Sequence, residues 1–196
     1  MNTRDNCIWK NFVEGDISAL KLLMEQYFRF LFNYGTKITK DEELVKDTVQ
    51  ELFIKLWTNK ENLSRDVNLK AYLITSLRRA LYRKIQALDR FDNFTDHDNN
   101  LLHFEFEFSV EQKFITAEFN KLLALKLAKH LSSLPKRQKE VLYLKFMENL
   151  TREEIAVVMN ISLQTVSNMC HIALKNLKAQ LGDTNQSKNN FYSLIY

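Results

Sequence analysis

The sequence predicts an all-helical protein made of two small domains. Among its 196 residues there are only three glycines and one proline, whereas sandwiches, barrels and doubly wound sheets need many tight turns, which draw mainly on glycine, proline, asparagine and aspartate. The apolar share of 45% is enough for a buried core. The length allows one larger domain or two small helical modules, and the charge distribution favours two.

The net charge of +4 is unevenly distributed along the chain. Counting Lys, Arg, Asp and Glu, residues 1–85 carry +4, residues 86–118 carry −6 and residues 119–196 carry +6. Two basic blocks therefore flank an acidic segment. Basic blocks are typical of proteins that bind a polyanion, but a modest excess of lysine also serves solubility, so charge alone does not decide between these alternatives.

The first basic block predicts three or more helices. Apolar residues recur at helical spacing over residues 17–32, and Gly35 is expected to end this helix. Thr39 and Glu42 form a capping-box pattern that opens a second helix, which runs to about residue 59. A third helix is predicted over residues 68–85. We place the first domain at residues 1–85.

The acidic segment at residues 86–110 lacks helical periodicity and is predicted to be a linker. Phe and Glu alternate over residues 104–108. This pattern indicates an extended piece of chain docked on another part of the protein, because a single strand has no partner in a helical protein. Helical periodicity then resumes, so the second domain is predicted at residues 111–182. The tail, residues 183–196, has no assignment.

Two start signals mark helices in the second domain. Pro135 is placed to open a helix over residues 136–147, because proline fits the first turn. Thr151 and Glu154 form a capping box for a short helix that ends near residue 159.

The last helix, residues 163–180, follows a three-residue turn at 160–162, and two helices joined by so short a turn form a helix-turn-helix. Its polar and apolar side chains separate on a helical wheel. A solvated face would explain the polar side. However, most of its residues are uncharged hydrogen-bonding groups that suit base edges in a major groove, with lysines at the far end for phosphates, so we interpret it as DNA-reading. The polar face comprises Gln164, Ser167, Asn168, His171, Lys175 and Lys178, and the apolar face Leu163, Val166, Met169, Cys170, Ala173 and Leu177.

The helix at residues 39–59 has apolar side chains on both sides. One stripe, predicted to be buried, comprises Val45, Thr48, Val49, Leu52, Phe53 and Leu56. The opposite face comprises Asp47, Gln50, Glu51, Ile54 and Trp57. Another helix of the same module could cover that face. Alternatively, its apolar centre and polar rim bind a protein partner, for which tryptophan is a common anchor, and we favour the partner.

The third helix, residues 68–85, combines arginines with aromatic rings on one side. Such a face can grip a phosphate backbone and stack unpaired bases. A merely solvated face is the alternative, but it rarely needs two tyrosines, so we predict contact with single-stranded nucleic acid. The face comprises Tyr72, Thr75, Arg78, Arg79, Tyr82 and Arg83, opposite the apolar Leu69, Leu73, Leu77, Ala80, Leu81 and Ile85.

These three faces around an acidic connector resemble the extracytoplasmic-function (ECF) group of bacterial RNA polymerase sigma factors, in the sigma-70 superfamily. Residues 47–57, DTVQELFIKLW, are similar to the family's signature on the helix that binds the polymerase clamp. The segments LPKRQKEV at 134–141, EEIA at 153–156 and TVS at 165–167 are similar to its promoter-reading C-terminal domain. The resemblance covers about residues 9–181.

The resemblance implies a role for each face. The first domain would bind core RNA polymerase through Asp47, Gln50, Glu51, Ile54 and Trp57. It would hold the separated strand of the minus-ten promoter element with Tyr72, Arg78, Arg79, Tyr82 and Arg83. The loop from Thr58 to Asn68 would pocket a flipped base, which supplies melting without nucleotide hydrolysis. The second domain would read the minus-35 element through Gln164, Thr165, Ser167, Asn168 and His171, with Arg137, Arg152 and Lys175 on phosphates.

The resemblance also implies further partners. The acidic linker would thread the polymerase channel that later carries RNA, and a membrane-anchored anti-sigma factor would bind the protein. The alternative is a stand-alone helix-turn-helix repressor with an N-terminal dimerisation or sensing domain. That alternative explains the last helix equally well, but it leaves Ile54, Trp57 and the acidic linker without a role.

The sequence does not indicate catalysis, a cofactor, a metal site or a small-molecule substrate. The three scattered glycines build no phosphate loop and no nucleophile elbow. The four histidines show no metal-ligand spacing, and the isolated Cys7 and Cys170 form no CxxC pair. There is no apolar h-region at the N-terminus and no apolar stretch of about 18 residues, so we expect a cytoplasmic protein.

Overall fold

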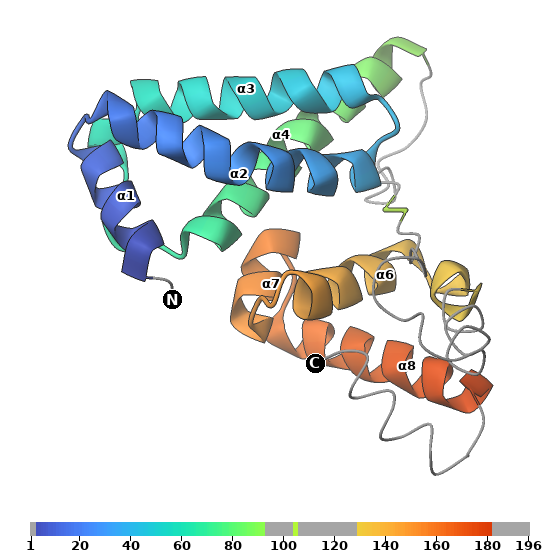
Figure 1. Ribbon diagram of the computed structural model, residues 1–196. Coiled ribbons are helices and arrows are strands. Elements are labelled where there is room, and N and C mark those ends of the chain that lie inside the picture. The colour runs from blue at the N-terminus through green and yellow to red at the C-terminus, as the bar shows by residue number, and fades with distance from the viewer. Residues whose placement is uncertain (1–2, 93–103, 106–128, 182–196) are drawn as a thin grey trace, which may run out of the picture. The chain divides into compact units, whose positions relative to one another are not determined.

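The computed structural model describes residues 3–92, 104–105 and 129–181, and the chain divides into two compact units, Met1–His103 and Phe104–Tyr196 (Figure 1). All regular elements within the described residues are helices. The predicted fold class, two helical domains of which the second contains a helix-turn-helix, is therefore confirmed. The tail at 183–196 and most of the predicted linker, residues 93–103 and 106–110, lie outside the described residues.

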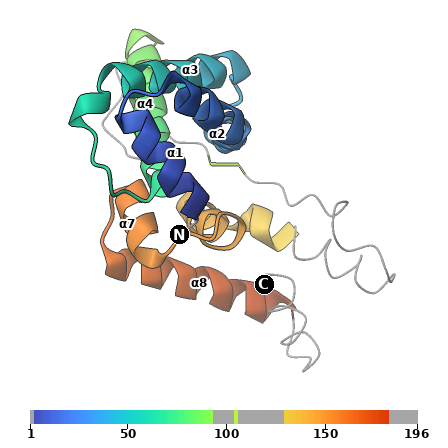
Figure 2. The same ribbon diagram turned by 60° about the vertical axis from the view of Figure 1, so that its left-hand side comes forward.

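The first unit is built from four α-helices. These are α1 (Thr3–Val13), α2 (Ile17–Ile38), α3 (Glu42–Thr58) and α4 (Leu69–Asp92), with a short 3-10 turn, η1 (Lys60–Asn62), after α3. Figure 1 shows α2 and α3 side by side, and Figure 2 shows α1 next to the first part of α4. The whole stripe of α3 that was predicted to be buried is buried, from Val45 to Leu56, and it packs on α2 and α4.

Gly35 does not end α2, contrary to the prediction. The helix continues to Ile38 and ends at Thr39, while Gly35 is buried inside it. A Cβ atom at this position would lie 2.5 Å from Cγ1 of Val45 and 3.4 Å from Cδ1 of Leu81. The glycine therefore permits the close approach of α2 to α3 and α4, which is a packing reason and not a turn signal.

The predicted capping box of Thr39 and Glu42 is also wrong. Asp41 caps α3, and its side chain accepts a hydrogen bond of 2.9 Å from the backbone N–H of Leu44. The hydroxyl of Thr39 instead accepts from the N–H of Asp41, at 3.2 Å. Aspartate is as good an N-cap as threonine, and the extra turn of α2 leaves Thr39 outside the helix that follows.

Helix α4 ends seven residues later than predicted. It starts as expected after Asn68, whose side chain accepts from the N–H of Ala71 at 3.1 Å, but it continues past Ile85 to Asp92. Residues 86–92 therefore belong to the helix, although their composition suggested the linker. In this added part the amide of Gln86 donates to the hydroxyl of Tyr82, at 2.6 Å.

The described part of the second unit contains a helical stretch at residues 129–133, α6 (Lys136–Leu142), a π-helical turn η2 (Tyr143–Met147), α7 (Arg152–Met159) and α8 (Leu163–Leu181). The predicted helix at 136–147 is thus present, with a π-helical last turn after Leu142. Leu131, Leu134, Leu142 and Ala173 form a buried cluster. The ring of Phe104 lies 5.5 Å from that of Tyr143, so the first residue of the alternating run is docked, as expected.

The predicted capping box of α7 is confirmed. The side chain of Thr151 accepts from the N–H of Glu154 at 3.2 Å, and the Glu154 carboxylate accepts from the N–H of Thr151 at 2.8 Å. Asn160 then adopts the left-handed conformation, with φ of 53°, and the hydroxyl of Ser162 accepts from the N–H of Thr165 at 3.0 Å. These contacts define the turn, at which α7 and α8 meet at 105°.

We expect Thr151→Ala to destabilise the second unit by about 1 kcal/mol, because it leaves an N-terminal N–H of α7 without its acceptor. Thr151→Ser keeps a hydroxyl acceptor and should have nearly wild-type stability. Urea unfolding followed by circular dichroism measures both variants. Equal stability of the alanine and serine variants would contradict the capping role.

Candidate nucleic-acid and partner interfaces

Helix α8 presents a line of polar side chains on its exposed side. Gln164, Asn168, His171 and Lys175 are all exposed and recur every three or four residues. The amide of Gln164 donates to Oδ1 of Asn168 at 2.9 Å, a bond that does not use the Asn168 amino group or the Gln164 side-chain oxygen. Side-chain amides of this kind pair with the donor and acceptor atoms of adenine in a major groove.

The other residues expected near this line differ in exposure. Ser167 is half-buried, and so is Thr165, whose hydroxyl lies 2.8 Å from that of Ser162 in the turn. On the apolar side, Val166, Cys170 and Ala173 are buried as predicted, but Leu163 is 42% exposed. Burial raises the pKa of the Cys170 thiol, so this cysteine is a neutral core residue. The side chains of Leu177 and Lys178 lie outside what the structure describes.

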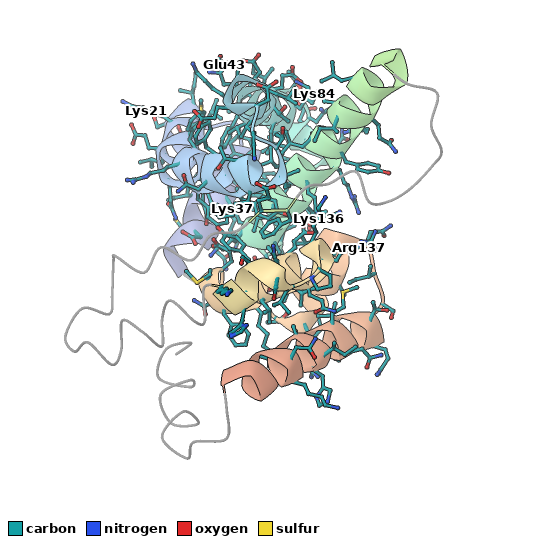
Figure 3. The ribbon with its side chains drawn as sticks, turned by 90° about the vertical axis from the view of Figure 1, so that its right-hand side faces the viewer. Lys21, Lys37, Glu43, Lys84, Lys136 and Arg137 are labelled. Atoms are coloured by element: carbon teal, nitrogen blue, oxygen red, sulfur yellow. The ribbon has the colours of Figure 1, made fainter. Side chains whose placement is uncertain are left out.

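Three cations of the second unit lie outside α8, at α6, η2 and α7. Arg152 is the exposed first residue of α7, and Arg137 is half-buried in the first turn of α6, where Figure 3 labels it. Burial raises the pKa of the Cys170 thiol, whereas the positive charges of Lys145 and Arg152 lower it. They therefore lie close to α8. Lys145, in the π-helical turn η2, was not among the predicted site residues.

Part of the predicted partner-binding face of α3 is exposed to solvent. Asp47 and Gln50 are exposed, and Ile54 is 63% exposed. Glu51 instead pairs with two cations: its carboxylate lies 2.8 Å from Nζ of Lys84, on α4, and 3.6 Å from Nζ of Lys55. The hydrogen bond from Lys84 is the main reason why the pKa of Glu51 lies below its usual value.

Trp57 is half-buried, and its ring contacts side chains from other parts of the first unit. Its ring lies 5.8 Å from that of Phe12, on α1, and Nζ of Lys60 lies 4.7 Å from its ring centre, within the range of a cation–π contact. The alternative interpretation was that another helix of the first unit covers this face of α3. Helix α1 partly covers Trp57, but Ile54 is exposed.

Helix α4 presents two of its predicted cations to solvent. Arg79 and Arg83 are exposed, and Nε of Arg83 donates to the Arg79 carbonyl at 3.3 Å. Arg78 and Tyr82 are half-buried. Thr75, expected on this face, is instead buried, and its hydroxyl donates to the carbonyl of Ala71 at 2.7 Å. A buried threonine satisfies its hydroxyl in this way within its own helix.

Tyr72 lies at the edge of the same face, next to α1. It is half-buried, and its ring lies 5.8 Å from that of Trp9. The indole N–H of Trp9 donates to the backbone carbonyl of Ser64 at 2.9 Å, in the loop between α3 and α4. Sequence reasoning missed Trp9, because its partner lies 55 positions further along the chain.

The described residues offer neither a metal-binding cluster nor a single helix that could span a membrane. Among the described residues, no three side chains of His, Cys, Asp or Glu gather as a metal ion would need. No single helix in the same part of the chain has the length and apolar composition of a membrane span. The pair of α7 and α8 meets both criteria only when the two helices are taken together across their bend.

The sequence matches two family models. Residues 23–91 match Sigma-70 region 2, and residues 130–179 match Sigma-70, region 4. The two matches together cover more than half of the chain, so the protein belongs to the sigma-70 family of sigma factors, the DNA-binding regulators that bind core RNA polymerase and direct promoter-specific transcription initiation. Its assignment to the ECF group within that family stays a prediction from the sequence motifs.

Solved structures show the same fold. The structure of CnrH in complex with the cytosolic domain of CnrY matches with a TM-score of 0.57 and 18% sequence identity, over 90% of this chain and 96% of that one. RpoE from Bartonella quintana, in complex with the anti-sigma factor NepR, matches with the same TM-score and identity, over 84% of this chain and 98% of that one. No curated protein matches the sequence significantly.

Proposed function

We propose that this sigma factor binds its targets through three separate surfaces. The face of α3 with Asp47, Gln50 and Ile54 binds the polymerase clamp, while α4 and the loop before it hold the separated strand of the minus-ten element. The exposed line of α8 reads the minus-35 element. The observation that carries the proposal is the exposure of Ile54 between polar neighbours, because a helix-turn-helix repressor would also have the α8 line but has no use for this apolar patch.

Each surface suits its proposed target chemically. An exposed apolar side chain with a polar rim is typical of a protein interface. Arg79 and Arg83 can neutralise phosphates, and Tyr72 and Tyr82 can stack on unpaired bases. On α8, uncharged amides suit base edges and Lys175 suits a phosphate. Glu51 and Trp57 contribute less directly, because each already has a contact inside the first unit.

We expect Ile54→Ala to weaken binding to core RNA polymerase about tenfold, because it truncates an apolar anchor at the centre of the patch. Ile17→Ala is the matched control: Ile17 is 69% exposed, but it lies at the start of α2. Binding of the full chain to purified core polymerase measures the effect, and transcription from a promoter library tests function. Equal affinities of the two variants would contradict the clamp assignment.

Trp57→Ala is a poorer test of the same surface. The ring of Trp57 contacts Phe12 of α1, so its removal also loosens the core. If the wild-type protein never joins the polymerase yet selects duplex sites, the repressor alternative is correct. Joining the polymerase and opening the promoters would exclude it.

An anti-sigma factor is a further proposed partner. Its support is that CnrH and RpoE, which share the fold, were solved in complex with CnrY and with the anti-sigma factor NepR. We propose that such a partner is membrane-anchored and covers the same clamp and promoter surfaces. The protein would then act in the cytoplasm, where polymerase and promoter DNA are found, by binding alone and without catalysis, a cofactor or a small-molecule substrate.

A further inference from the structure

Helix α1 lies outside both matched family regions but contacts the loop that precedes α4. Trp9, near the middle of α1, is 1% exposed, and its indole N–H donates to the carbonyl of Ser64 at 2.9 Å. The same ring lies 5.8 Å from Tyr72 of α4 and is stacked on Phe12 at 5.3 Å. A single side chain therefore contacts both elements that we assign to the minus-ten strand.

The turn after α1 lies close to the loop between α3 and α4 at two further points. The carboxylate of Glu14 lies 3.7 Å from the guanidinium of Arg65, next to Ser64 in the loop. Gly15, with φ of 93°, lies so close to Lys60 that a Cβ would be 3.4 Å from its side chain. Ser64 and Arg65 therefore each contact a side chain of α1 or of the turn after it, and Lys60 lies close to that turn, in a segment that has only one short 3-10 turn of its own.

Helix α1 is itself anchored away from the loop. The hydroxyl of Tyr27, on α2, donates to Oδ2 of Asp5 at 3.0 Å, and the amide of Gln26 donates to Oδ1 at 2.7 Å. Burial and the Asp5 carboxylate both raise the pKa of Tyr27, so its hydroxyl stays protonated and can donate. Helix α1, which is hydrogen-bonded to the loop through Trp9, is thus also hydrogen-bonded to α2 through Asp5.

We propose that Trp9 is a positioning residue for promoter opening, which holds the loop at residues 58–68 in the shape that accepts a minus-ten base. This inference rests on the proposed function of the first unit. A loop that must receive an extruded base gains from being ordered in advance, because binding then costs less conformational entropy. The hydrogen bond to Ser64 fixes the backbone of the loop, and contact with Tyr72 sets the loop relative to α4.

The test compares Trp9→Phe with Tyr27→Phe in the full chain bound to core polymerase. Both variants remove one partly buried donor that involves α1, but only the first loses the hydrogen bond to the loop. The probe is the best promoter from the library experiment, together with versions that carry single-base changes across the minus-ten element. Opening is measured by permanganate reactivity of unpaired thymines, and polymerase affinity and thermal unfolding are measured alongside.

We expect Trp9→Phe to reduce the preference for the best promoter over its single-base variants about fivefold, the effect of one lost hydrogen bond. Polymerase affinity should be unchanged, and Tyr27→Phe should keep the wild-type preference. Equal preferences in the two variants, or a defect shared by both, would overturn the proposal. If the wild-type protein itself fails to open any promoter, the proposed function fails instead.

Glu14→Ala keeps the proposal testable if Trp9→Phe does not fold. Glu14 is exposed, so its replacement leaves the core intact but removes the ion pair with Arg65. A smaller loss of the same base preference, about twofold, is expected because exposed ion pairs contribute little. A wild-type preference in this variant, with Trp9→Phe unfolded, would count against the positioning role.

Discussion

Replacing Gly35 with alanine is expected to lower the free energy of unfolding of the first unit by about 2 kcal/mol. The new Cβ would lie 2.5 Å from Cγ1 of Val45, a separation that side-chain carbons do not tolerate. Val45 is fully buried and β-branched, so it has little freedom to turn away. Alanine is the better helix former by about 1 kcal/mol, which offsets only part of the cost of pushing α2 and α3 apart.

The two tryptophans, Trp9 and Trp57, both lie in the first unit, so tryptophan fluorescence during urea unfolding measures this unit alone. The control is Val45→Ala, which removes both methyl groups that the new Cβ would meet. Adding Gly35→Ala to that variant should cost at least about 1 kcal/mol less than adding it to the wild type, since residues in contact are not additive. A Gly35→Ala protein as stable as wild type would show that α2 and α3 can separate without cost.

Gly35 also shows which parts of the fold the sequence could predict. Helical periodicity reports which side of a helix is apolar, so the buried stripe of α3 was predicted correctly, although the helix α1 was missed. It does not report what packs against a position. A glycine that ends a helix and a glycine that admits a neighbouring helix look the same in a single sequence, and only the proximity of Val45 distinguishes them.

The ends of helices were the next weakest part. Thr39 and Asp41 are both good N-caps, and the structure uses Asp41 because α2 continues for an extra turn. The helix α4 continues into a stretch whose acidic composition suggested a linker, because composition alone does not break a helix. The capping box at Thr151 was correct, since there only one pair of residues has the required chemistry and spacing.

The exposure of the candidate site residues was also predicted correctly for some residues and wrongly for others. A helical wheel placed Gln164, Asn168 and His171 correctly on an exposed line, because no other element in the described residues covers them. It also placed Trp57, Tyr72 and Thr75 on open faces, whereas contacts with α1 partly cover the first two and Thr75 is buried. The periodicity of one helix contains no information on a second helix that packs over its edge.

Asn168→Ala is expected to cost about 1–3 kcal/mol in binding at one base position of the minus-35 element. Two effects combine in this variant. The Asn168 amino group, which the bond to Gln164 does not use, is lost, and Gln164 loses the acceptor that orients its amide at 2.9 Å. Binding of the holoenzyme to the best promoter and to each single-base variant of the element measures the change, at a fixed salt concentration because phosphate contacts are salt-dependent.

Two control variants separate base reading from general affinity. Lys175→Ala should weaken binding to all sequences alike and reduce the salt dependence by about one phosphate contact. Asn176→Ala makes the same chemical change on an exposed residue of α8, rotated by about 80° around the helix from Asn168, and should leave binding unchanged. If Asn168→Ala weakens all promoters uniformly, as Lys175→Ala does, Asn168 contacts only the backbone, and the sequence preference must come from other residues of α8.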